Sequence, residues 1–126
     1  MKRIFVTALI GLFALGLTGT AEASTKTVDA YCSPSGDFCQ GIFREDGRIK
    51  LRMSQFPFRG KYQLCVKPPR KSQSCNRFRW RKKKLGLFRG GVDFARHYPS
   101  KQKGRYKVTW RVSGSKVGKT LKFRKG

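Results

Sequence analysis

One stretch decides the fold: Arg105-Tyr106-Lys107-Val108-Thr109-Trp110-Arg111-Val112. Polar and apolar side chains alternate along its whole length, which is typical of a β-strand with one buried face. A turn at Ser113-Gly114-Ser115 follows, and the alternation resumes in Lys119-Thr120-Leu121-Lys122-Phe123-Arg124. The carboxyl end is therefore predicted to be a β-hairpin whose aromatic and aliphatic side chains point inward.

Further strands are predicted upstream by the same alternation. Weaker or shorter runs occur at 25–31, 48–53, 61–67, 75–81 and 91–98, and Gly, Pro, Asn or Ser residues bound them. No segment shows sustained helical periodicity. About seven short strands in roughly 100 residues indicate an all-β chain, a single antiparallel β-sandwich. A five-stranded OB-like barrel is the alternative, because it also fits short alternating strands in this length.

The start of the deciding strand adds a resemblance. Gly104-Arg105-Tyr106-Lys107-Val108 follows the polar loop 99–103 and resembles the tyrosine corner that opens the sixth strand of immunoglobulin-like and fibronectin type III-like domains. The likeness covers roughly the last 25 residues. The chain lacks the cysteine pair that bridges the two sheets of antibody domains, so the resemblance implies a sandwich and no binding residues.

The first 23 residues are typical of a signal peptide. Lys2 and Arg3 precede an uncharged apolar run at 4–17, and Ala21-Glu22-Ala23 supplies the small-x-small cleavage pattern. The run would span about 21 Å as a helix, short of the ~30 Å core of a membrane. We expect cleavage after Ala23, no transmembrane segment, and a secreted (extracellular or periplasmic) monomer with a single domain at 24–126.

The cysteines are predicted to be structural. Six residues lie between Cys32 and Cys39 and nine between Cys65 and Cys75, whereas zinc-binding pairs are usually closer. Four cysteines allow three connectivities. Strand alternation places Cys65 and Cys75 on the solvent face of paired strands, so we expect these two to be linked, and Cys32 with Cys39. No metal or cofactor is expected.

The chain carries a large positive charge. Thirty Lys and Arg residues face six Asp and Glu, for a net charge of +24. Without the signal peptide, which holds two basic residues and one acidic residue, 28 basic and five acidic residues remain. Alternation directs many of these cations outward, and adjacent turns add more. The predicted polyanion-binding residues are Lys61, Lys67, Arg77, Arg79, Arg81, Lys82, Lys83, Lys84, Arg105, Lys107, Arg111, Lys122 and Arg124.

This pattern favours an exported, non-catalytic module that binds an anionic polymer by salt-sensitive electrostatics. A cell-envelope polyanion, an acidic polysaccharide or extracellular nucleic acid would fit. Arg77-Phe78-Arg79-Trp80-Arg81 would suit base stacking only if its rings were exposed. A strand instead directs Phe78 and Trp80 into the core, opposite the arginines.

Other function classes stay open. A protein-interaction module, adhesin-like or inhibitor-like, would display the loop between Cys32 and Cys39, and a cationic antimicrobial protein would share the charge. An enzyme is not expected. The one histidine, His97, would need Glu45 or Asp93 beside it for acid–base chemistry, and the sequence gives no sign that they meet.

Overall fold

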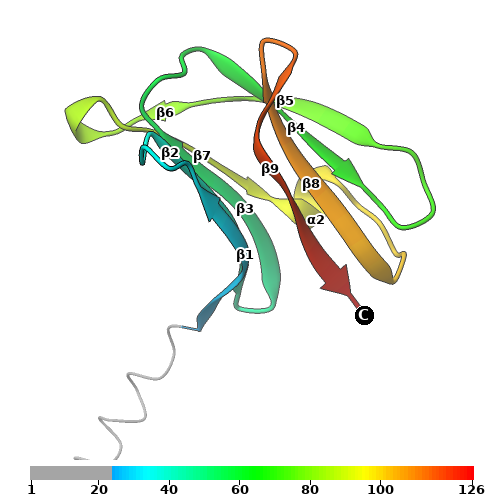
Figure 1. Ribbon diagram of the computed structural model, residues 1–126. Helices are drawn as coiled ribbons and strands as arrows, with labels where there is room; N and C mark the ends of the chain where they lie inside the picture. The colour runs from blue at the N-terminus through cyan, green and yellow to red at the C-terminus, as the bar shows by residue number, and fades with distance from the viewer. Residues whose placement is uncertain (1–23) are drawn as a thin grey trace, which may run out of the picture.

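The structure is a computed structural model that describes residues 24–126; the expected signal peptide, 1–23, lies outside the described residues. Within residues 24–126, nine strands form two antiparallel sheets, whose arrangement can be followed in Figure 1. The strands are β1 (Thr25–Cys32), β2 (Phe38–Glu45), β3 (Arg48–Gln55), β4 (Lys61–Lys67), β5 (Ser74–Arg79), β6 (Arg81–Lys82), β7 (Phe88–Asp93), β8 (Gly104–Val112) and β9 (Ser115–Lys125). A 3-10 turn at Lys84–Gly86 and the one-turn helix α2 (Phe94–His97) are the short helical elements of this region.

The strand order is that of a sandwich. Sheet A has the order β1-β2-β3-β7-β6, and sheet B has the order β5-β4-β8-β9. Counting β2 as the first strand, β2-β3-β7-β6 and β4-β8-β9 reproduce the A-B-E-D and C-F-G sheets of immunoglobulin-like sandwiches, with β5 beside the C strand and β1 added outside. The predicted fold class is confirmed, and the barrel alternative is wrong, because the described sheets do not close on each other.

The core lies between the two sheets. Along β8 the side chains of Tyr106, Val108 and Trp110 are fully buried, while their neighbours on the strand point away. The same period of two buries Tyr62 and Leu64 in β4. From the facing sheet A, the core receives Ile42, Leu51, Met53 and Val92. The inward residues that the alternation predicts in β4, β8 and β9 are confirmed, because a strand can bury only every second side chain.

The tyrosine corner is present as a hydrogen-bonded unit. Tyr106 donates its hydroxyl to the carbonyl oxygen of Gln102 at 2.6 Å, and the hydroxyl lies 2.7 Å from Ser100 Oγ. These bonds connect the loop before β8 to the buried ring, which is the contact that the resemblance implied.

The prediction and the structure differ at three places. β2 was not predicted, because Gln40 faces inward and Phe43 outward, which hides its alternation. The predicted strand 75–81 divides: β5 ends at Arg79, and β6 joins sheet A. The predicted strand 91–98 ends at Asp93, where α2 begins.

The helix α2 is held by Tyr98, which follows it. Tyr98 donates its backbone N–H to the carbonyl of Phe94 at 2.8 Å and its hydroxyl to the carbonyl of Leu64 at 2.5 Å. Burial raises the pKa of this hydroxyl to about 12, so it stays protonated and can donate. Phe94 is still buried, as the alternation predicted for it.

Side chains from sheet A cover the outer edge of β9. Asp29 Oδ2 accepts the backbone N–H of Lys122 at 2.9 Å, and Gln40 Oε1 accepts that of Lys119 at 2.7 Å. Figure 1 shows β1 and β9 on the same side of the sandwich, where they contact each other. Covering an edge in this way satisfies backbone groups that would otherwise pair with another chain.

Both expected disulfides form, and each links directly opposed residues of a hairpin: Cys32 with Cys39, and Cys65 with Cys75. One detail of the prediction is wrong. Cys75 is exposed, but Cys65 is fully buried although its strand position is on the outer face. In the register it lies between Cys75 and Thr109, because β4 is an inner strand of sheet B.

Candidate functional site

The outer face of sheet B carries most of the predicted binding residues. The inward positions of its strands are apolar, so the alternate positions turn basic side chains to solvent. We call this surface the cationic face; its basic residues are Lys61, Lys67, Arg77, Arg79, Arg105, Lys107, Arg111, Lys116, Lys122 and Arg124. None of the four strands contains Asp or Glu.

Like charges oppose each other directly across this face. Lys67, Lys107 and Lys122 are cross-strand partners in one row. Arg105 opposes Arg124, and in the same hairpin Arg111 opposes Lys116. Each such contact destabilises a sheet by roughly 0.2–1 kcal/mol. A merely solvated surface would relieve this repulsion with interspersed acidic residues.

An uncharged band divides the cationic face in two. It consists of the Cys65–Cys75 bridge, Thr109 and Thr120, whose hydroxyl oxygens are 3.0 Å apart. The lysine row of Lys107 lies on one side and the row of Arg111 on the other, four residues apart and hence about 13 Å. A ligand that meets both rows must be extended and must carry several negative groups.

Two hollows lie at the lysine-row end of the cationic face. One of about 410 Å³ is lined by Lys67, Arg105, Lys107 and Arg124 against a wall formed by the prolines at 68–69. The other, of about 650 Å³, lies between the loops at 70–71 and 99–103 and is also mainly basic. In the first hollow, Lys67 Nζ donates to the carbonyls of Pro68 and Lys71, so the other three cations are the better placed to meet a ligand.

The remaining predicted residues lie elsewhere. Arg81 and Lys82 form β6, which belongs to sheet A, and Lys83 and Lys84 follow it. Arg81 and Lys82 do not continue the outer face of sheet B as the alternation implied, because the chain changes sheets at Trp80. That these four residues bind an anion stays a prediction. Lys116 was not predicted, and it joins the face through its pairing with Arg111. Its position could have been found by continuing the alternation through the hairpin turn.

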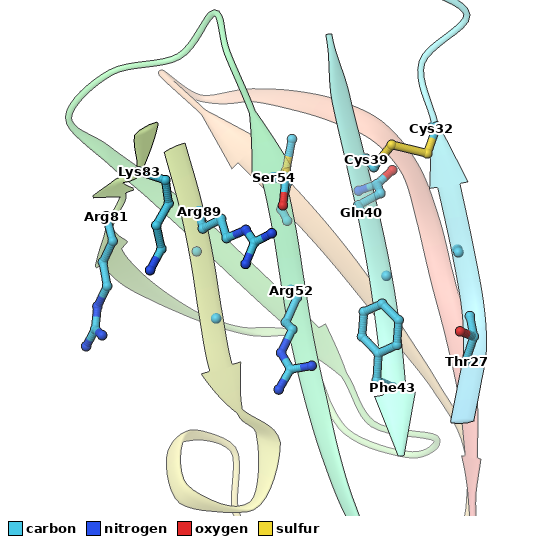
Figure 2. Close-up of a pocket in the computed structure, with 15 residues that line it drawn as sticks. Thr27, Cys32, Cys39, Gln40, Phe43, Arg52, Ser54, Arg81, Lys83 and Arg89 are labelled. Atoms are coloured by element: carbon cyan, nitrogen blue, oxygen red, sulfur yellow. A yellow bond between two sulfur atoms is a disulfide. The ribbon is translucent and has the colours of Figure 1, made fainter. Parts of the chain in front are cut away.

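The outer face of sheet A contains a separate hollow of about 810 Å³, which we call the sheet A hollow (Figure 2). Ala30, Gly41 and Gly91 contribute small side chains or none to its lining. Phe43 and Thr27 lie on one side of it and Arg81 and Lys83 on the other, while the guanidinium groups of Arg52 and Arg89 lie between, as Figure 2 shows. The Cys32–Cys39 bridge lies at one end. No residue of this hollow except Arg81 and Lys83 and the two cysteines was singled out from the sequence.

Acidic residues accompany some of the cations on sheet A. Asp93 accepts from Lys50 at 3.2 Å and from Arg48 at 3.4 Å. Partial burial opposes ionisation of Asp93, but the hydrogen bond from Lys50 and the two positive charges prevail and lower its pKa. Glu45 accepts from Arg52 at 2.8 Å. At this end of sheet A the cations therefore have acidic partners, in contrast to those of the cationic face.

In the described part of the chain, His97 contacts an aromatic ring and an amide group. Its ring packs edge-on against Phe78, with centroids 5.0 Å apart, and its carbonyl accepts from Asn76. Within residues 24–126 neither Glu45 nor Asp93 forms a hydrogen bond with it, and both acids pair with cations instead. The same region contains no group of three or more potential metal ligands.

The aromatic residues of the arginine-rich segment 77–81 do not offer a stacking surface. Trp80 is 8% exposed and stacks on the ring of Tyr62, with centroids 4.1 Å apart. Phe78 is half-buried against the core. These positions agree with the predicted core role.

The loop between Cys32 and Cys39 is a tight turn. Ser33 donates its backbone N–H to the carbonyl of Phe38 at 2.9 Å, and Gly36 donates back to Ser33 at 2.9 Å. Phe38 already belongs to β2 and packs near Tyr31 and Phe58. The segment is therefore a short turn that its own backbone hydrogen bonds close, and it does not project from the sheet as a long loop would.

The most exposed apolar side chain of the described region is Leu85, which is 97% exposed. Its backbone is left-handed (φ 60°, ψ 33°), a conformation that disfavours branched side chains. Lys83 donates to the carbonyl of Leu87 at 2.6 Å and closes the turn beneath it. Three lysines at 82–84 precede this apolar tip.

Comparisons with known proteins show one remote structural likeness and no family. No family model matches the sequence, and no curated protein is similar to it. One solved structure that is similar in fold is described as the crystal structure of the Br derivative of BhCBM56, a carbohydrate-binding module. It is 16% identical, with 77% of this chain and 99% of that chain covered, and the TM-score is 0.39. A likeness this remote assigns neither a family nor a binding residue to this chain.

Proposed function

We propose that the protein is a non-catalytic module that binds an anionic polymer through the cationic face. The observation that carries the proposal is the set of directly opposed cations on four strands that contain no acidic residue. An anionic ligand would relieve the repulsion between these side chains and so gain affinity from it. Large fields of one sign commonly serve binding or steering.

The geometry favours a polymer over a small anion. The two cationic rows are about 13 Å apart, so one sulfate or phosphate group cannot meet both. Arg105 and Arg124 can each grip an oxoanion with two hydrogen bonds, while Lys107 acts as a point charge between the arginine pair and the uncharged band. Because the nearby rings are buried, such binding would recognise charge and spacing and would not read bases.

The setting we propose is outside the cytoplasm. Two disulfides fit an oxidising compartment, and within residues 24–126 no helix is long and apolar enough to cross a membrane. A cell-envelope polyanion, an acidic polysaccharide and extracellular nucleic acid all supply the required charge. In this proposal the module binds its ligand and does not change it chemically.

Neutralising the hollow at the end of the cationic face tests the proposal. We expect the triple substitution Arg105→Gln, Lys107→Gln and Arg124→Gln to weaken binding to heparin on the order of a hundredfold near 0.1 M salt, because about three counterion-releasing contacts are lost. The dependence of log affinity on log salt should become shallower by about three. Isothermal calorimetry across a salt series measures both quantities.

The matched control removes the same charge from elsewhere. Lys26, Arg48 and Arg96 are exposed and belong to β1, β3 and α2, outside sheet B. Changing these three to Gln should alter the affinity less than tenfold. Equal losses in the two triple variants would mean that net charge alone governs binding and that the cationic face is not a site.

Two alternatives have weaker support. A protein-interaction module displaying the 33–38 segment has little to present, because that segment is a closed turn. The feature that best supports a cationic antimicrobial protein is the exposed Leu85 with the lysines before it. Release of dye from anionic liposomes at the concentrations that saturate heparin would favour that class over a simple binder.

A further inference from the structure

We propose that the sheet A hollow is a second binding site, which takes a segment of an acidic polysaccharide. This site lies on the opposite sheet from the cationic face, so it does not depend on the proposed function. Three features carry the inference: a floor with glycine or alanine at three of its four positions, an aromatic ring at one side, and cations without an ion-pair partner among the described residues at the other.

The floor is open although the fold does not require it to be. Ala30, Gly41, Arg52 and Gly91 are consecutive partners in one row across β1, β2, β3 and β7. A β-carbon added at Gly91 would meet only Arg52 Cγ, at the ordinary contact distance of 3.8 Å. Glycine in a strand is less favourable than alanine, because it loses more conformational freedom on folding. A residue that costs stability without a steric need is best explained by the space that it leaves free.

Gly41 has a different role in the same floor. A β-carbon there would lie 2.7 Å from two atoms of the Phe43 ring, so the ring reaches over Gly41. The Arg52 guanidinium carbon is 5.6 Å from the centre of that ring, and Glu45 holds Arg52 from the side at 2.8 Å. The site therefore presents an apolar ring beside a fixed hydrogen-bond donor. The apolar face of a sugar and its hydroxyl groups fit such a pair.

The opposite side of the hollow supplies the positive charge. Arg81 and Arg89 are direct cross-strand partners, and Lys83 lines the hollow beside them. Within the described part of the chain none of these three forms an ion pair. Two opposed guanidinium groups repel each other unless an anion lies between them. A carboxylate or sulfate group on the sugar chain would fill that position with bidentate hydrogen bonds.

The size of the hollow indicates a segment of a chain. Phe43 on β2 and Arg81 on β6 are three strand spacings apart across the sheet, about 14 Å, and four residues apart along it, about 13 Å more. A volume of about 810 Å³ falls in the range of ligand sites that hold a molecule of several rings. Single-stranded nucleic acid would want an aromatic surface for successive bases, and Phe43 is the single aromatic residue of the lining. Acidic sugars need only one ring contact and spaced anions.

The experiment uses the full domain with the hollow at the end of the cationic face neutralised, which weakens that face and leaves its other seven basic residues in place. In the background Arg105→Gln, Lys107→Gln and Arg124→Gln, binding of a heparin hexasaccharide and of an oligogalacturonate hexamer is measured by calorimetry. We expect residual binding of at least one of them, and we expect Gly91→Val to reduce it at least tenfold. The melting temperature should be unchanged or higher, because valine is favoured over glycine in a strand.

A second variant tests the contribution of the cations separately from that of the free volume above Gly91. Arg81→Gln with Arg89→Gln should reduce residual binding by a similar factor while leaving Gly91 in place. The inference is overturned if the triple variant binds neither sugar. It is also overturned if adding Gly91→Val leaves unchanged the affinity for a sugar that the triple variant binds, or if a single-stranded oligonucleotide binds more tightly than both sugars. Failure of the proposed function would instead appear as an unaltered heparin affinity in the triple variant without further changes.

Discussion

Raising the salt concentration from 50 to 200 mM is expected to weaken the affinity of the protein for heparin about a thousandfold. The reason is counterion release: each cation that contacts the polymer displaces condensed counterions, and the slope of log affinity against log salt approaches −0.9 per contact on a densely charged chain. With about six contacts from the cationic face, the slope is about −5. Fluorescence anisotropy of a labelled heparin fragment over a salt series measures it.

A neutral polysaccharide of the same length serves as the control, and it should show no salt-dependent binding to the cationic face. A heparin affinity that stays constant over this range would contradict electrostatic binding. Such a result would indicate that apolar contacts, such as stacking of a sugar on the Phe43 ring, dominate the binding.

Reducing both disulfides is expected to lower the free energy of unfolding by about 5 kcal/mol. The bridged cysteines are separated by 7 and 10 residues. In the chain-entropy model, loops of this size contribute on the order of 2.5–3 kcal/mol each, because the bridge restricts the unfolded chain. For a domain of about this length, the melting temperature should fall on the order of 20–40 °C. Calorimetry with and without a thiol reductant gives the difference.

Paired serine substitutions divide this effect between the bridges. Cys32→Ser with Cys39→Ser, and Cys65→Ser with Cys75→Ser, should each remove about half of it. A reduced protein that melts within a few degrees of the oxidised form would show that the core between the sheets suffices alone. The assignment of the bridges as structural staples would then be wrong.

The sequence predicts the carboxyl-terminal half of the fold well, and the reason is physical. In β8 and β9 every inward side chain is apolar and almost every outward one is polar, so alternation alone identifies both faces. Tyr106 adds a local signal, because its hydroxyl bonds to a carbonyl only four residues away. The disulfide pairs were predictable for the same reason, since each closes a short hairpin.

In the amino-terminal half, β1 and β3 were predicted at 25–31 and 48–53, but β2 was missed, because the partners of its inward polar residue are long-range. In β2 the Oε1 atom of the inward Gln40 accepts the backbone N–H of Lys119, and Oδ2 of Asp29 in β1 accepts that of Lys122. A polar residue that finds its partner some 80–90 positions away looks like a surface residue in the sequence. Phe43 shows the reverse: it is apolar and faces outward over Gly41.

The two candidate sites also differ in how far local alternation could predict them. Most of the cationic face followed from alternation, whereas Arg81 and Lys82 do not continue it, because the chain changes sheets there. The sheet A hollow could not be predicted, because its floor is a row of residues from four strands, and strand order is not encoded in local pattern. Whether either surface binds a polymer remains a prediction.

Lysine protection tests the central claim most directly. The protein is acetylated briefly with and without saturating heparin at low salt, and modification of each lysine is measured by mass spectrometry. The cationic face predicts strong protection of Lys107 and Lys122 and little protection of Lys26, which lies on β1. Equal protection of all three lysines, or protection of Lys26 alone, would contradict it.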